Sequence, residues 1–178
     1  MQHIQSYLTD LKSALDALDL NALIEARALL QRARDEGKQV FVCGNGGSAS
    51  TASHLANDLG KGASYGRPQS QRFRVIALTD NVPWMRALAN DVGYEHIFAE
   101  QLKNFAQAGD VLLAISGSGN SPNVLNAVAL AKELGVKTIG WSGFGGGKLA
   151  QMVDVPVVVK SQHMGRVEDV HVVMMHLV

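Results

Sequence analysis

Five short apolar runs, separated by helical patterns, constrain this chain more than any other feature of its sequence. The runs lie at residues 39–43, 73–78, 110–115, 136–141 and 153–159. They are apolar almost without interruption, which is typical of strands that are covered on both faces. Strands that alternate with helices form βαβ units, and such units build a parallel sheet. The sequence therefore predicts an α/β fold around a parallel sheet.

Helical periodicity fills most of the chain between these runs. The predicted helices lie at residues 4–18, 20–36, 48–60, 82–91, 95–106, 122–134 and from 166 to the end, and residues 61–72 are predicted to form a loop. The first helix carries five aliphatic residues spaced four, three, four and three apart: Ile4, Leu8, Leu11, Leu15 and Leu18. Such a two-heptad seam packs either on its own domain or on a helix of another subunit. We favour the subunit contact.

Composition excludes several classes of protein. The 178 residues suit one domain, and 16 basic residues balance 16 acidic ones, which argues against a nucleic-acid binder with a broad basic surface. Cys43 has no cysteine partner, so no disulfide framework exists. No stretch approaches the length of a membrane span and no signal peptide is recognisable. We expect a soluble cytoplasmic protein without a membrane or nucleic-acid partner.

Two glycine- and serine-rich loops follow the first and third apolar runs, at residues 44–48 and 116–121. Ligands of open parallel sheets bind beyond the carboxyl ends of the strands. Glycines allow backbone N–H groups to approach an anion, and the helix that begins behind each loop favours negative charge. No Gly-Lys-Ser/Thr follows either loop, so we predict a single phosphate on a small molecule rather than a nucleoside triphosphate. The alternative is a pair of tight turns with N-capping serines.

The first loop also fits a dinucleotide fingerprint, because Gly44, Gly46 and Ala49 have the spacing G-x-G-x-x-A. The acidic residue expected about 20 positions further on is missing. The nearest candidate, Asp80, lies 36 positions after Gly44. We therefore favour the phosphate loop over a nicotinamide or flavin enzyme.

Two helices carry residues suited to proton transfer or metal binding. His54 and Asp58 are four apart and share a helix face, although a surface polar pair would have the same spacing. The last helix carries Glu168, His171 and His176, and its polar residues would also suit a solvated face. Helical angles slightly favour His171 as the partner of Glu168.

Taken in order, these segments resemble the phosphoheptose isomerases of the sugar isomerase (SIS) family. The resemblance rests on residues 44–48, His54, Asn90–Asp91, 109–116, 118–121 and 166–171. It implies a three-layer SIS fold with a five-stranded parallel sheet, a single domain over residues 1–178, and helices within 1–36 as a subunit contact. It also implies a homotetramer with active sites at subunit interfaces. The activity implied is conversion of sedoheptulose 7-phosphate to D-glycero-D-manno-heptose 7-phosphate, for lipopolysaccharide or other heptose-containing glycans.

The resemblance also assigns roles to residues of this chain. Substrate-binding positions map to Asn45, Gly46, Ser48, Asp91, Ser116, Ser118, Ser121 and Glu168. The acid–base pair maps to Asp58 and His176, and a zinc site maps to His54, Asp58, Glu168 and His176. The resemblance thus favours His176 over His171.

Two of these positions depart from the family pattern, because Asp58 stands for a Glu and Glu168 for a Gln. They make the site more anionic, which suits zinc and also harder divalent ions. Two other functions stay open: a non-catalytic SIS paralogue that binds a protein, such as a replication initiator, and an isomerase for another phosphosugar. The retained His54, Asp58, Glu168 and His176 argue against the first.

Overall fold

A five-stranded parallel sheet forms the centre of the protein, whose computed structural model describes residues 1–178. The strands are β1 (Gln39–Gly44), β2 (Arg74–Ala77), β3 (Val111–Ser116), β4 (Lys137–Ser142) and β5 (Val155–Val158). Their order across the sheet is β2-β1-β3-β4-β5, and every neighbouring pair is parallel. The predicted sheet is confirmed, and each strand begins and ends within two residues of its apolar run.

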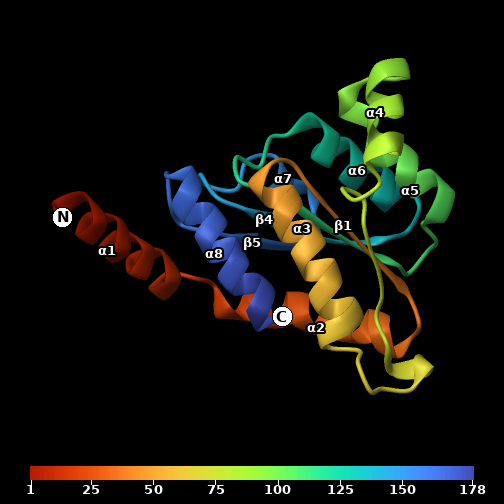
Figure 1. Cartoon of the computed structure of the whole chain (residues 1–178), viewed down its shortest axis with the longest axis horizontal. Helices are drawn as coiled ribbons and strands as arrows, with labels where there is room; N and C mark the ends of the chain where they lie inside the picture. Colours follow the sequence, from red (N-terminus) through yellow and green to blue (C-terminus); the bar gives the residue numbers. More distant parts are fainter.

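Helices cover both faces of this sheet (Figure 1). The helices are α1 (Gln2–Asp16), α2 (Leu20–Asp35), α3 (Gly47–Asn57), α4 (Val82–Asp91), α5 (Ala99–Phe105), α6 (Pro122–Glu133), α7 (Leu149–Met152) and α8 (Met164–Leu177). Side chains alternate between the two faces along each strand. In β1, Val40 and Val42 join the core formed with α2, α3 and α8, whereas Phe41 and Cys43 join the core formed with α5 and α6. The fold therefore has the three predicted layers.

Four local features differ from the predictions. The helix expected to run to residue 60 changes at Asp58 into a π-helical turn, η1 (Asp58–Gly62), whose Gly60 and Gly62 are poor helix formers. The helix expected at 95–106 is split into a 3₁₀ turn, η3 (Tyr94–His96), and α5. The loop at 61–72 contains a second 3₁₀ turn, η2 (Gln69–Gln71). The short helix α7 follows the late glycine cluster and was not predicted.

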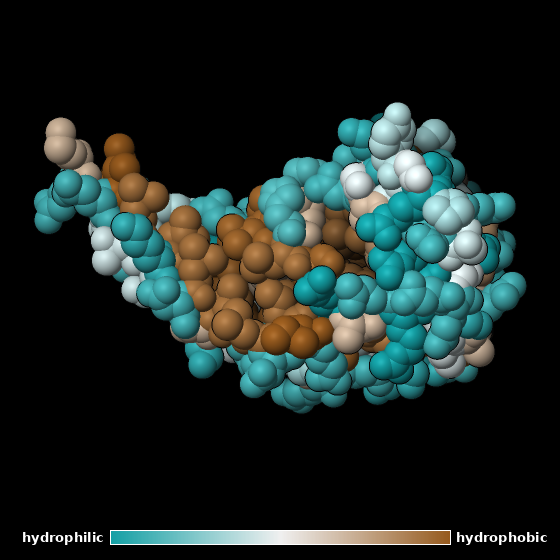
Figure 2. All heavy atoms as spheres, turned by 90° about the horizontal axis from the view of Figure 1, so that it is seen from below, coloured by the Kyte–Doolittle hydropathy of each residue, from teal (hydrophilic) through white to brown (hydrophobic).

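The first helix uses only half of its apolar seam within the chain. Leu11, Leu15 and Leu18 pack against the core, whereas Ile4 is 64% exposed and Leu8 is 50% exposed. Figure 1 shows α1 projecting from the body, and Figure 2 shows apolar side chains along a concave strip that continues from this helix onto the body. The seam thus leaves an apolar surface without a partner in this chain.

Two polar contacts fix the angle at which α1 leaves the body. The Tyr7 hydroxyl donates a hydrogen bond to Asp169 of α8 at 2.6 Å, and Asp10 pairs with Arg166 at 2.7 Å. The exposed end of the seam is therefore held in place by α8.

None of the helices combines the length and the apolar character that crossing a membrane requires.

Candidate active site

The two glycine- and serine-rich loops form a single cavity. Gly44 of β1 is paired with Ile115 of β3, so the loops that follow these neighbouring strands lie beside each other. The cavity measures about 250 Å³ and is lined by residues 45–48, 115–118, Ser121, Met164 and Glu168. It thus contains all the predicted substrate-binding residues except Asp91.

Backbone geometry opens this cavity to a ligand. Gly46 has φ +54°, a left-handed conformation that glycine adopts readily. A Cβ on Gly47 would lie 2.6 Å from Oε1 of Glu168, so a larger residue here would displace the Glu168 carboxylate from its place beside the loop. Both α3 and α6 begin directly behind the loops, and α6 has Pro122 in its first turn. Their free N–H groups give the cavity the character of an anion site.

Hydrogen bonds hold the second loop in shape and tie the first loop to the helix that follows the second. The Ser116 and Ser121 hydroxyls lie 3.0 Å apart, and the Ser118 hydroxyl accepts the backbone N–H of Asn120 at 3.2 Å. Asn45 and Asn123 exchange two amide hydrogen bonds of 2.8 Å. The Asn45 side chain therefore joins the first loop to α6 instead of pointing freely at a ligand.

The charge of the cavity is unusual for a phosphate site. No Lys or Arg lines it, whereas the carboxylate of Glu168 does. The sequence predicted that Glu168, in place of the Gln of the family pattern, makes the site more anionic. The structure places its carboxylate beside the two glycine- and serine-rich loops. The donors that a phosphate would meet here are backbone N–H groups and hydroxyls.

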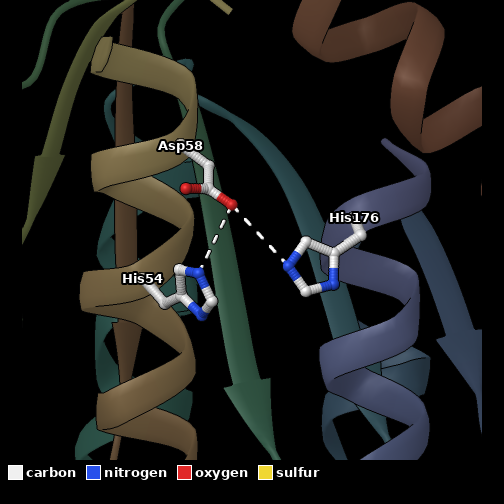
Figure 3. A group of neighbouring side chains, drawn as sticks. All are labelled: His54, Asp58 and His176. Atoms are coloured by element: carbon white, nitrogen blue, oxygen red, sulfur yellow. Dashed lines mark ion pairs between the residues drawn. The ribbon is translucent and has the colours of Figure 1, made fainter. Parts of the chain in front are cut away.

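A second cluster lies further along α3, where His54, Asp58 and His176 meet (Figure 3). Nε2 of His54 lies 3.4 Å from Oδ2 of Asp58, and Nε2 of His176 lies 3.8 Å from the same oxygen. The two imidazole rings make an edge-to-face contact with centroids 5.3 Å apart. The other carboxylate oxygen, Oδ1, accepts the amide of Asn57 at 3.0 Å. A carboxylate with one oxygen held and the other shared by two imidazoles can bind a cation or exchange a proton.

The two histidines of the last helix have different surroundings. His171 is 1% exposed, lies against Trp141, and neither of its ring nitrogens has a hydrogen-bond partner. Burial lowers the pKa of His171 to about 4, so this imidazole is neutral at ordinary pH. His176 instead faces Asp58. Helical angles favoured His171 because it lies closer in angle to Glu168 around the helix axis. In the structure, the face of α8 that carries His171 packs on the sheet, so His171 is not available to a ligand.

Glu168 lies away from the metal cluster in which it was expected, and Asp91 lies away from the substrate cavity in which it was expected. Glu168 and His176 are eight residues apart on one helix, about 12 Å along its axis, so Glu168 is not in the cluster of potential metal ligands. Asp91 ends α4, accepts the Asn90 amide at 2.7 Å, and does not line the cavity between the loops.

Three residues that support the site were not predicted. Asn123 and Tyr94 hold Asn45, the latter through a hydroxyl that donates to Oδ1 at 3.0 Å, and Asn57 holds Asp58. The position of Asn123, the second residue of the helix behind the second loop, was a usable signal. The sequence contains no signal for Tyr94, because only the fold brings η3 to the first loop.

Comparisons with known proteins agree with this architecture. Residues 4–143 match the SIS domain family. A phosphoheptose isomerase of Campylobacter concisus is 42% identical over 144 residues, which are 80% of this chain and 74% of the relative. A phosphoheptose isomerase of Rhodospirillum rubrum is 40% identical over 158 residues, 88% of this chain and 81% of the relative.

The structural comparison extends over almost the whole chain. The structure of a phosphoheptose isomerase from Francisella tularensis superimposes with a TM-score of 0.90 at 31% identity, covering 99% of this chain and 92% of that one. The resemblance seen in the loop and helix motifs is therefore confirmed by sequence and by fold. The chain belongs to the SIS domain family and, within it, to the phosphoheptose isomerases.

Proposed function

We propose that the protein isomerises sedoheptulose 7-phosphate to D-glycero-D-manno-heptose 7-phosphate. The observation that carries this proposal is the combination of an anion-type cavity with the His54, Asp58 and His176 cluster on the same pair of helices. The cavity suits the phosphate of a sugar phosphate, and the cluster suits proton transfer at the other end of the same sugar molecule. Membership of the phosphoheptose isomerases supports this substrate.

The conversion of a ketose to an aldose moves a proton from C1 to C2 through an enediol. Asp58 is the base that takes the proton from C1, and the His176 imidazolium protonates the carbonyl oxygen at C2. The imidazole then takes the hydroxyl proton at O1 while the carboxyl returns its proton to C2. Each of these groups contributes typically 10²–10⁴-fold to the rate.

The serine loops bind and orient the substrate. Hydroxyls of Ser48, Ser116, Ser118 and Ser121 and the N–H groups at the starts of α3 and α6 surround the phosphate. A phosphate fixed at one end limits the positions that the reacting carbons can reach, which lowers the entropic cost of reaction. Along α3, Ser48 and His54 are six residues or about 9 Å apart, a distance that an extended seven-carbon sugar phosphate can span.

The His54, Asp58 and His176 side chains would also hold zinc. Two ligands that are each about 2 Å from a tetrahedral ion lie about 3.3 Å apart, close to the 3.4 Å and 3.8 Å separations of this cluster. Two imidazoles and a carboxylate form a donor set typical of catalytic zinc, with one position left for substrate. When bound, zinc would polarise the sugar carbonyl.

We further propose that the active enzyme is a single-domain homotetramer whose sites lie between subunits. The exposed half of the α1 seam offers an apolar surface for another copy. The separation of Glu168 from His176 along α8 supports a site that draws on more than one chain, since Glu168 of one subunit could then join the cluster of another.

The decisive experiment follows sedoheptulose 7-phosphate by NMR, with and without added zinc. Turnover should appear for the wild type and fall by on the order of 10²-fold in Asp58→Ala or His176→Ala. Ser118→Ala should weaken binding of the phosphorylated sugar and leave unphosphorylated sedoheptulose almost unaffected. Full activity in both Asp58→Ala and His176→Ala would refute the catalytic role of the cluster.

A further inference from the structure

A larger cavity lies on the opposite flank of α3 from the His54, Asp58 and His176 cluster. This groove, bounded by α3, α4 and α5, has the edge strand β2 as its floor and a volume of about 680 Å³. The volume is typical of pockets for small organic molecules. No residue that lines it contacts the phosphate or exchanges a proton in the proposed reaction, and only Asn57 touches the cluster, through its hydrogen bond to Asp58.

Asp80 is the only ionisable side chain that lines the groove, and no cation balances its charge. Oδ1 of Asp80 accepts the hydroxyls of Ser53 and Thr79, whereas Oδ2 accepts no hydrogen bond within the chain. No Lys, Arg or His lines the groove, and Asp80 has no ion-pair partner. An occupant that carries positive charge and N–H donors would satisfy this carboxylate.

Gln101 adds a buried acceptor to the same wall. Its side chain is 2% exposed, and its amide nitrogen donates to the carbonyls of Leu78 at 3.0 Å and Ile97 at 2.8 Å. These two bonds fix the amide orientation, and the carbonyl oxygen Oε1 is left without a donor in the chain. Because Gln101 lines the groove, a ligand that donates a hydrogen bond can reach this oxygen from there.

Two aromatic rings form the opposite wall. Trp84 and Phe105 make an edge-to-face pair with centroids 5.8 Å apart and an interplanar angle of 76°. Phe105 is substantially exposed, although it is apolar. Tryptophan offers the most favourable ring face for a cation, and a flat cation also gains area by stacking on it.

We propose that this groove binds a small planar organic cation with N–H donors, namely an amidinium or a guanidinium carried on an apolar body. The cation meets Asp80, its N–H groups reach Oε1 of Gln101, and its flat face lies on Trp84. The apolar body covers the exposed side chains of β2, among them Ile76. Each unsatisfied feature of the groove is matched by one part of such a ligand.

The groove also lies one hydrogen bond from the catalytic carboxylate. Asn57 lines the groove and donates its amide to Oδ1 of Asp58 at 3.0 Å. A ligand that displaces the Asn57 amide alters the orientation of Asp58. This coupling rests on the proposed isomerase function, whereas the binding site itself does not.

The binding test uses benzamidine and the indole N–H resonances of the full chain. Trp84 lies in the groove, and the other tryptophan, Trp141, is fully buried in the opposite core and serves as an internal reference. Benzamidine should shift the Trp84 resonance with saturation and leave Trp141 in place, and benzoate should shift neither. Asp80→Asn should weaken binding by on the order of tenfold, and Phe105→Leu should weaken it while preserving the apolar volume.

A matched control is Glu25→Gln, which removes one exposed negative charge on α2 and should bind benzamidine like the wild type. The proposed site would be overturned if Asp80→Asn bound benzamidine as tightly as the wild type, or if benzoate shifted the Trp84 resonance as much as benzamidine does. Saturating benzamidine should change kcat for sedoheptulose 7-phosphate in the wild type but not in Asp80→Asn. Binding with an unchanged kcat would refute the coupling through Asn57, and a protein without isomerase activity would leave the binding result intact.

Discussion

The carboxylate of Glu168 has the largest effect of any single residue on the charge of the phosphate cavity. It lies against Gly47, within a cavity that contains no Lys or Arg. A phosphate dianion bound there is repelled by this charge at short range, and the repulsion is screened little inside a cavity. The residue therefore weakens the binding of phosphosugar unless a cation lies between the two groups.

Replacement of Glu168 by Gln tests this repulsion, because it keeps the shape of the side chain and removes the charge. We expect the KM for sedoheptulose 7-phosphate to fall several-fold in kinetics measured without added metal. Glu25→Gln, which removes an exposed charge on α2, should leave the KM unchanged. A KM that rises in Glu168→Gln would show that the carboxylate assists binding, for example by holding a metal.

The buried His171 predicts a loss of stability in acid. Its pKa is lowered from 6.5 to about 4 in the folded chain, so between these values the unfolded chain binds a proton that the folded chain does not. Stability is complete above pH 6.5 and falls as the pH decreases toward 4, by about 2 kcal/mol between pH 8 and pH 5. Urea unfolding of wild type and His171→Leu should show that the variant loses less stability over this interval. Parallel pH profiles for the two proteins would contradict this.

Among the elements, α2 depends on a cap that the sequence encodes locally. Oδ1 of Asp19 accepts the backbone N–H groups of Asn21 at 3.0 Å and Ala22 at 3.1 Å. Loss of an N-cap side chain costs about 1 kcal/mol. Asp19→Ala should therefore lower the free energy of unfolding in urea by about this amount. Asp16→Ala, which removes an exposed carboxylate at the end of α1, provides the matched control, and an equal loss in both variants would rule out the cap.

Elements were predictable where the signal was local. Apolar runs predicted all five strands, and the glycines and serines of residues 44–48 and 116–121 predicted both loops of the phosphate cavity. The contact of Tyr94 with Asn45 depends on packing between segments far apart in sequence. Gly60 and Gly62 indicate that the regular helix ends near Asp58, but they do not by themselves predict a π-helical turn. Helical angles alone could not choose between His171 and His176, because they do not say which face of α8 meets the sheet.

At the scale of the whole molecule, aliphatic side chains on the first two helices are left exposed. Ile4 and Leu8 on α1 and Leu20 and Ile24 on α2 are each at least half exposed. Burial of such side chains contributes about 1.5–3 kcal/mol each. The polar contacts of Tyr7 and Asp10 with α8 hold α1 in position. The helix would therefore lose little conformational entropy if its exposed side chains bound another copy.

Charge introduced on the exposed half of the α1 seam should therefore reduce the size of the assembly. The double variant Ile4→Glu with Leu8→Glu places two carboxylates where the seam would meet another copy, and desolvating them there is unfavourable. Light scattering should give a smaller mass than for the wild type, and removal of residues 1–18 should have the same effect. The control is Gln5→Glu with Thr9→Glu, which adds the same charge one residue further along the same helix, outside the seam, and should keep the wild-type mass. An unchanged mass in both the seam variant and the truncated chain would mean that α1 serves only its own domain.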